Sequence, residues 1–147
     1  MSIRKPMLLC GLLLVAGCVQ AGPRHAAAQA CSPAQAEAAD AMVDKLDDWV
    51  AVGRFFRAYR QCDDGYIAEG SSDAIARLLA GQWETLPKLQ TLIRQEPALR
   101  AFVLSHVNST LDTDELERIK RNASESCPSD GASLCADLRQ AADRASK

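Results

Sequence analysis

Residues 31–62 read CSPAQAEAADAMVDKLDDWVAVGRFFRAYRQC, and this stretch decides the fold because a cysteine stands at each end. Ser32-Pro33-Ala34-Gln35 begins a helix, since serine caps it, proline suits the first turn and glutamine can bond back to the cap. Apolar residues then recur at helical spacing to about Leu46. Asp47 or Asp48 can cap a second helix. The apolar face of that second helix consists of Val52, Phe55, Phe56 and Tyr59.

The turn between these two helices determines which cysteines can pair. One unbroken helix over residues 33–60 would be about 40 Å long, so its ends could not meet. A turn at Asp47-Asp48 gives two arms of about 21 Å each, and an antiparallel return brings Cys62 beside Cys31. Cys127 and Cys135 flank a short turn and can close locally. Of the three possible connectivities, we therefore prefer Cys31–Cys62 with Cys127–Cys135.

The chain beyond Cys62 continues as helices. A third helix is expected from near Asp64 to Trp83, but Gly70-Ser71-Ser72 weakens its middle, so a break with a restart at Asp73 is the alternative. Leu86, Leu89 and Ile93 mark a fourth helix. Glu96-Pro97 ends it and opens a fifth, whose apolar face is Leu99, Phe102, Val103 and His106.

The clearest helix start is Leu111–Leu116, where Asp112 caps, Glu115 can reach back and Leu111 can contact Leu116. A seventh helix follows the turn-rich segment 127–131. Runs of β-branched and aromatic residues with period two are missing. Residues 31–147 suffice for one core and not for two. We therefore predict an all-α fold, a compact bundle of about six or seven short helices with two disulfides, in a single domain over 31–147.

The first 30 residues predict export. Arg4 and Lys5 precede a leucine-rich apolar run, residues 7–15, which is too short to cross a hydrocarbon core of about 30 Å. A charged start, a short apolar run and small residues behind it are typical of a secretory signal sequence, here residues 1–30. A permanent membrane anchor is the alternative.

Two cleavage sites are open. Val15-Ala16-Gly17-Cys18 resembles the lipobox of bacterial lipoproteins, which implies a signal over 1–17, a lipidated Cys18 and a tether over 18–30. Ala28-Gln29-Ala30 instead fits ordinary signal peptidase. Either cut leaves Cys31, Cys62, Cys127 and Cys135 in the domain, an even number typical of two disulfides in an exported protein. We expect the periplasm, with membrane attachment through Cys18 only if the lipobox is used.

The charge of the domain excludes one class of partner. Three of the 17 basic residues and none of the 19 acidic residues lie in residues 1–30. The remaining 14 basic and 19 acidic residues give a net charge of −5. Nucleic acids are bound by concentrated lysine and arginine, so no nucleic-acid partner is expected.

The sequence offers little for catalysis or metal binding. His106 is the one histidine of the domain, and its place on an apolar helical face is typical of a core histidine with satisfied partners. With the cysteines paired, neither a thiolate nucleophile nor a typical zinc site is expected. Asp63-Asp64-Gly65 lacks the alternating calcium-loop pattern, and one of its carboxylates more simply caps a helix. We expect no catalytic residue, no metal and no cofactor.

The densest acidic cluster supplies the candidate binding residues, Asp63, Asp64, Tyr66 and Glu69. Tyr59 and Cys62 run into Gly65-Tyr66-Ile67-Ala68-Glu69-Gly70, followed by Asp73-Ala74. This arrangement resembles periplasmic immunity proteins that protect bacteria from the cell-wall amidase toxins of type VI secretion. The resemblance implies a helical fold over 31–147, a protein partner that is a cell-wall hydrolase, and the possibility of a homodimer. No inhibitory loop of that family matches here residue by residue.

The expected function is therefore an exported, non-enzymatic binding protein that blocks a cell-wall-degrading toxin. An accessory lipoprotein of a periplasmic or outer-membrane assembly is the alternative. An envelope hydrolase, the third possibility, would require His106 to be exposed in a cleft beside a serine or a carboxylate.

Overall fold

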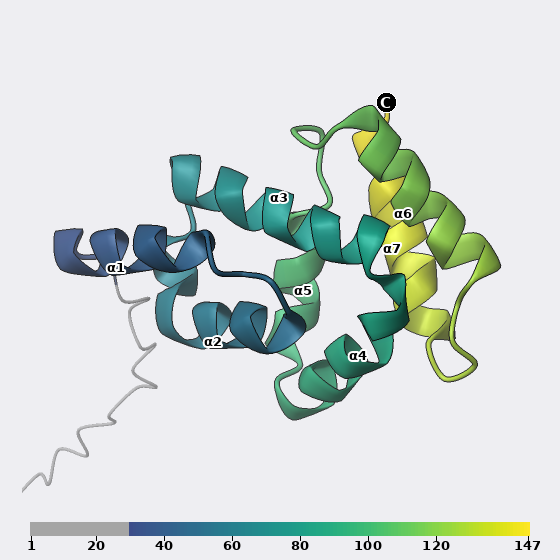
Figure 1. Ribbon diagram of the computed structural model, residues 1–147, viewed down its shortest axis with the longest axis horizontal. Coiled ribbons are helices and arrows are strands. Elements are labelled where there is room, and N and C mark those ends of the chain that lie inside the picture. Colours follow the sequence, from purple (N-terminus) through teal and green to yellow (C-terminus); the bar gives the residue numbers. More distant parts are fainter. Residues whose placement is uncertain (1–29) are drawn as a thin grey trace, which may run out of the picture.

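The computed structural model describes residues 30–147, which form α-helices and two short 3-10 helices with no strand in that range (Figure 1). The elements are α1 (Pro33–Val43), α2 (Trp49–Tyr59), η1 (Arg60–Cys62), α3 (Gly65–Gly81), η2 (Trp83–Thr85), α4 (Leu86–Gln95), α5 (Ala98–Ser105), α6 (Thr113–Glu125) and α7 (Ala132–Ala145). The predicted all-α fold is confirmed. The predicted signal sequence, Cys18 and the tether up to residue 29 lie outside the described residues.

The first two helices form the predicted hairpin. Ser32 and Gln35 make the reciprocal capping bonds at the start of α1, and Asp48 accepts from the Ala51 N–H at the start of α2. The prediction that the first helix reaches Leu46 is wrong, because α1 ends at Val43 and Leu46 N–H bonds back to the Val43 carbonyl in a tight turn. The Leu46 side chain is nevertheless buried. The return of α2 brings Cys62 to Cys31, with 4.9 Å between their Cα atoms, and the predicted disulfide is confirmed.

Helix α3 is the longest helix of the described chain and joins the two ends of the molecule. In Figure 1 it runs from the α1–α2 hairpin at one side to α6 at the other. The expected weak point at Gly70-Ser71-Ser72 does not break it. Ser71 and Ser72 are buried, and a Cβ on Gly70 would overlap Val43 Cγ1 of α1. Small residues therefore occur here because α1 crosses α3 closely.

The close crossing of α1 and α3 at Gly70 predicts that a larger residue there destabilises the domain. Alanine favours a helix over glycine by about 1 kcal/mol, but overpacking a filled site costs about 1–3 kcal/mol. We expect Gly70→Ala to lower the free energy of unfolding by about 1 kcal/mol, measured by urea titration. Gly81→Ala in the same helix, where a Cβ meets nothing within 4 Å, should be neutral or stabilising. Stabilisation by Gly70→Ala would show that Val43 moves aside freely.

In Figure 1, α4 lies at the lower side of the bundle and α5 lies in the middle of the view, between α3 and α4. Leu86 and Leu89 of α4 and Leu99 and Val103 of α5 are almost wholly buried. Phe102 of α5 packs against Phe55 and Phe56 of α2, with ring centroids 6.3 and 5.1 Å away. These contacts hold α5, and with it His106, against α2.

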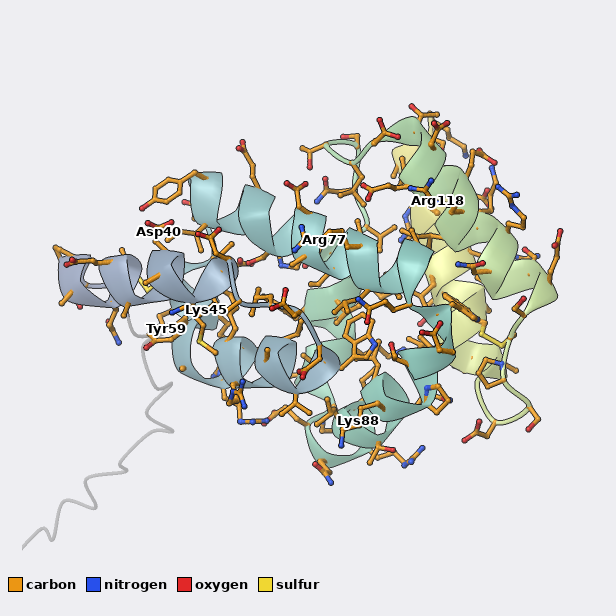
Figure 2. The ribbon with its side chains drawn as sticks, viewed as in Figure 1. Asp40, Lys45, Tyr59, Arg77, Lys88 and Arg118 are labelled. Carbon is orange, nitrogen blue, oxygen red and sulfur yellow. A yellow bond between two sulfur atoms is a disulfide. The ribbon has the colours of Figure 1, made fainter. Side chains whose placement is uncertain are left out.

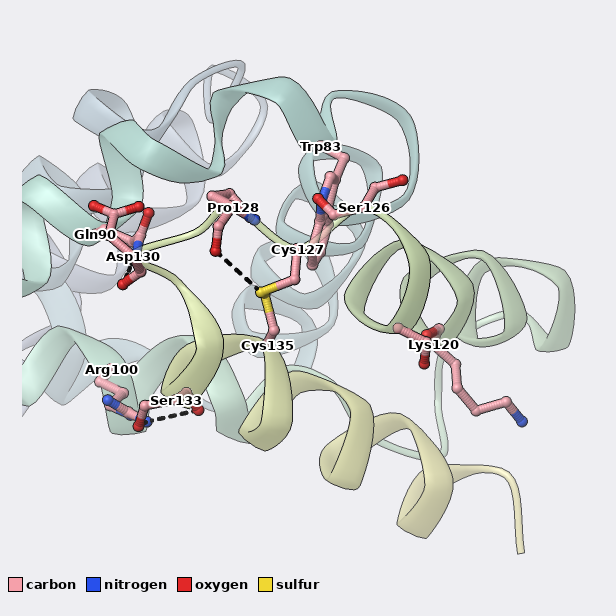
Figure 3. The surroundings of a disulfide bond; sticks show 11 residues. Trp83, Gln90, Arg100, Lys120, Ser126, Cys127, Pro128, Asp130, Ser133 and Cys135 are labelled. Carbon is pink, nitrogen blue, oxygen red and sulfur yellow. Dashed lines mark hydrogen bonds between the residues drawn. A yellow bond between two sulfur atoms is a disulfide. The ribbon is translucent and has the colours of Figure 1, made fainter.

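Helices α6 and α7 form a second hairpin. Asp112 caps α6 as predicted, but it accepts from the Asp114 N–H, and the expected reciprocal bond from Glu115 is not formed. Cys127 and Cys135 form the second predicted disulfide. Figure 3 shows this disulfide between two links to the rest of the fold. Trp83 Nε1 donates to the Ser126 carbonyl at 2.8 Å, and Gln90 Nε2 donates to the Asp130 carbonyl at 3.1 Å.

One contiguous core connects the two hairpins. Its largest fully buried side chains include Trp49, Phe55, Ile75, Leu89 and Ile119, which come from α2, α3, α4 and α6. Within residues 30–147, none of the helices has the length and apolar character needed to cross a bilayer. The described helices thus share one hydrophobic core.

Candidate functional site

A surface depression of about 340 Å³ lies between the start of α3 and the end of α5. Its polar lining residues are Asp63, Glu69, Ser72, Ser105, His106 and Asn108, joined at the edge by Thr110. Ligand sites commonly have volumes of about 300–1,000 Å³ and a few converging polar groups. This depression is small but fits that description, and it contains two of the residues selected from the sequence.

His106 forms the floor of the depression. It is the C-cap of α5 and is only 4% exposed. Its ring packs edge-on against Phe102 one turn earlier, with centroids 4.5 Å apart. The predicted burial of the histidine is confirmed, but the expected satisfied partners are found only at Nδ1, because Nε2 has no hydrogen-bond partner among residues 30–147.

Ser72 lies on one side of the His106 ring. Its Oγ is 2.9 Å from Nδ1 and 2.8 Å from the Ala68 carbonyl oxygen. A hydroxyl has one proton, so it donates either to that carbonyl or to the imidazole. The tautomer of His106 selects between these two arrangements. In both of them the single hydroxyl proton of Ser72 is already used inside the protein.

Asp63 lies on the other side of the ring. Its Oδ2 is 2.9 Å from His106 Nε2, and this nitrogen has no hydrogen-bond partner in the described part of the chain. The Asp63 side chain is 10% exposed and its Oδ1 is buried without a hydrogen-bond partner in the described part of the chain. The pair is therefore close and largely desolvated, and one acceptor of the carboxylate remains free.

The backbone around Cys62 explains the position of Asp63. Cys62 is buried and tied to Cys31, so the residue that follows it has little freedom. Asp64 accepts from the Gly65 N–H, and Gly65 has φ of +54°, a conformation that favours glycine. This tight start to α3 turns the chain and leaves Asp63 directed at His106.

The serine, histidine and aspartate resemble a hydrolytic triad only in composition. Ser72 is 3% exposed and lies in the middle of α3, where backbone N–H groups are bound to carbonyls one turn earlier. Attack by a serine needs an accessible Oγ and free N–H donors for the developing oxyanion. His106 itself is buried, whereas a hydrolase would need it exposed. The geometry favours a network that holds three segments together.

A loop after α5 closes one side of the depression. Asn108 Oδ1 accepts from both the N–H and the hydroxyl of Thr110, at 2.9 and 2.7 Å. Asn108 Nδ2 donates to the Ser105 carbonyl at 3.1 Å and lies 3.4 Å from Ser72 Oγ. The Ser105 hydroxyl donates to the Phe102 carbonyl at 2.7 Å. The donors of this wall are thus occupied within the protein.

The four residues selected from the acidic cluster separate into two groups. Asp64, Tyr66 and Glu69 are exposed, and Tyr66 at 64% is the one exposed large hydrophobic side chain among residues 30–147. Glu69 lies one helical turn after Tyr66 and lines the depression. Asp63 is instead nine-tenths buried against His106. The sequence placed all four in one patch because it could not show which carboxylate turns inward.

Sequence reasoning missed Ser72, Ser105, Asn108 and Thr110. Ser72 and His106 are 34 residues apart, and no local pattern connects them. The one available signal was a histidine on an apolar helical face, which needs polar partners wherever it is buried.

A second charged depression lies between α3 and α6. Arg77 and Arg118 line it from the two helices, as Figure 2 shows, together with Asp73 and Glu115. Burial raises the pKa of the Glu115 carboxyl, while nearby Arg118 opposes the rise and Asp73 adds to it. Asp112 and Asp114 line it too, so it holds four acidic and two basic side chains. Within the described residues, none of these side chains has a buried polar atom without a hydrogen-bond partner, so this depression is a weaker candidate.

A third hollow, of about 280 Å³, lies beside Trp49 at the start of α2. Trp49 Nε1 already donates to Thr85 Oγ1 at 2.8 Å, so its polar group is satisfied internally. The charged residues around it are Asp48, Glu84 and Lys88, again of both signs. This hollow has no unpartnered buried group and is a weaker candidate.

Within the described residues, no group of three or more histidine, cysteine or acidic side chains is placed to hold a metal ion. The sequence matches no protein-family model, and no curated protein or solved structure is significantly similar to it. The fold and the site therefore define a structural class of protein. It is a disulfide-bonded, all-α domain with a polar depression beside one exposed tyrosine.

Proposed function

We propose that this chain is an exported, non-enzymatic binding protein that blocks a cell-wall-degrading toxin. The observation that carries the proposal is Tyr66, an exposed aromatic side chain between the carboxylates of Asp64 and Glu69. Aromatic residues dominate the energy of protein interfaces, whereas a large apolar side chain gains nothing from exposure to water.

The two disulfides support the proposal that the chain is exported. Both are structural bonds within a small domain, and such bonds persist in oxidising compartments such as the periplasm. The predicted signal sequence supports the same location. The site supports binding over catalysis, because the Ser72 hydroxyl and the His106 ring are buried and engaged with each other. The resemblance of residues 59–74 to amidase immunity proteins supports the choice of partner.

The first experiment uses the full chain with a C-terminal tag, exported by its native host and recovered from the envelope with bound proteins. We expect a stoichiometric cell-wall hydrolase, identified by mass spectrometry, whose activity on peptidoglycan falls when the tagged protein is added back. An envelope complex without a hydrolase would contradict the toxin-blocking function. That result would instead support an accessory lipoprotein.

Tyr66 is expected to be the main anchor of this complex. Truncation of an interface anchor commonly costs about 2 kcal/mol or more, so Tyr66→Ala should weaken the complex by about 30-fold. Glu125→Ala, an exposed change on the last turn of α6, is the control and should leave the affinity unchanged. Affinity can be measured by titration calorimetry with the captured hydrolase. Equal affinities of the Tyr66→Ala and Glu125→Ala variants for the hydrolase would show that Tyr66 is not part of the interface.

A further inference from the structure

We propose that the depression between α3 and α5 binds a guanidinium or ammonium group, supplied by a lysine or arginine side chain of the protein partner. This inference rests on the proposed function for the source of the group. The chemistry of the site itself rests on the contacts within the depression.

The hydroxyl and amide donors that line the depression are engaged within the protein. The Ser72 hydroxyl proton goes to Ala68 or His106, the Ser105 hydroxyl donates to Phe102, and the Thr110 hydroxyl donates to Asn108. The side-chain amide of Asn108 also donates within the protein. His106 Nε2 is the lining side-chain nitrogen without a hydrogen-bond partner among residues 30–147, and it lies 2.9 Å from the Asp63 carboxylate, which would repel a phosphate or a carboxylate there.

The depression also has carboxylate acceptors that no donor in the described part of the chain pairs with. Asp63 Oδ1 is buried and has no hydrogen-bond partner among residues 30–147, and its side chain is nine-tenths buried in the lining of the depression. Most buried polar atoms in proteins are paired, so an orphan carboxylate oxygen indicates a missing donor. Glu69 adds a second carboxylate at the rim, and Asp64 is exposed nearby.

The charge of the lining residues favours a cation. The depression is lined by two carboxylates and by no lysine or arginine. Among the lining residues, His106 is the one side chain that could carry a positive charge. Its Nε2 faces Asp63 and its Nδ1 faces Ser72. Guanidinium offers five N–H donors in a fixed plane and ammonium offers three, with no acceptor on either. A basic side chain thus matches the free groups of the depression in both charge and hydrogen bonding.

The position relative to Tyr66 links the depression to the proposed interface. Glu69 lies one helical turn after Tyr66 on α3, so both side chains can meet one partner surface. An aromatic anchor beside a charge-assisted contact is a common core of a protein interface. The partner segment would place an apolar group against Tyr66 and a basic group in the depression.

The test titrates the exported protein, purified from the envelope, with methylguanidinium chloride at constant ionic strength. Backbone amide resonances of Glu69 and Asn108 and the His106 ring signals report on the depression. We expect saturable shifts at these residues, with binding weakened by about fivefold in Glu69→Gln. Glu69 is exposed, so this variant should fold normally. Glu125→Gln removes the same charge from a distant exposed position and should bind as the unaltered protein does.

Absence of shifts at the depression, or equal binding by Glu69→Gln, would overturn the proposal. The captured hydrolase identifies the source of the cation. Weaker hydrolase binding by Glu69→Gln, and competition by methylguanidinium, would assign it to a partner side chain. Methylguanidinium could instead bind while Glu69→Gln leaves the affinity for the hydrolase unchanged. That result would support the cation site but overturn the partner side chain as the source of the cation. The ligand would then be a free amine. Failure to capture any hydrolase would count against the proposed function while the methylguanidinium titration still decides the site.

Discussion

Replacing Cys31 and Cys62 together by serine is expected to lower the free energy of unfolding by about 3–4 kcal/mol. The bond spans a sequence separation of 31 residues, and closing a loop of that length restricts the unfolded chain strongly. The free energy of unfolding of a folded protein is typically about 5–15 kcal/mol, so this loss would be a large share of the total. Guanidinium unfolding followed by circular dichroism measures the difference.

The second disulfide is the matched control. Cys127 and Cys135 are only 8 residues apart, so their double replacement should cost less, about 2–3 kcal/mol. The first replacement also frees the segment that carries Asp63, which should change the environment of the His106 ring. A larger loss from the Cys127–Cys135 pair would contradict the chain-entropy argument. Unaltered His106 resonances without the Cys31–Cys62 bond would show that other contacts fix Asp63.

Truncation of His106 is expected to have a similarly large effect. His106→Ala leaves the Asp63 carboxylate buried without its partner and opens space beside Phe102, so we expect a loss of about 3 kcal/mol. The measurement is the free energy of unfolding near neutral pH. A loss this large would show that the histidine stabilises the domain, whatever its part in binding.

A double-mutant cycle isolates the contact between the two residues. Asp63→Ala and His106→Ala should each destabilise the domain, and the double variant should lose less than the sum of the two, with a coupling of about 1–2 kcal/mol. The pair is close and little exposed, so solvent screens it weakly. Additive losses would show that the 2.9 Å approach contributes nothing to stability.

The positions of the helices were largely predictable because their signals are local. Ser32, Asp48 and Asp112 each cap the helix that follows, as the sequence indicates, and Pro97 separates α4 from α5. The Cys31–Cys62 pairing followed from helix length and the turn at Asp47-Asp48, and the Cys127–Cys135 pairing followed from the short turn between these two cysteines. These predictions need only a few neighbouring residues and the rise of a helix.

The middle of α3 and the end of α1 were not predictable in this way. Gly70-Ser71-Ser72 has poor helix propensity, yet it stays helical because α1 packs on it closely at Val43. The chain leaves α1 at Val43, earlier than the apolar spacing suggests, because the turn to α2 must bury Leu46. In both places tertiary packing outweighs a local preference of about 1 kcal/mol.

The sequence by itself determined the helix starts, the all-α fold, the two disulfides and the acidic segment that carries Tyr66. Only the tertiary structure decided that Asp63 turns inward, that Ser72 and His106 meet, and that Glu69 stands at the rim of a depression. Caps and helical periodicity act over one or two turns, and a disulfide needs only two ends brought together. The site depends on residues from η1, α3 and α5, whose relative positions arise only when the core packs.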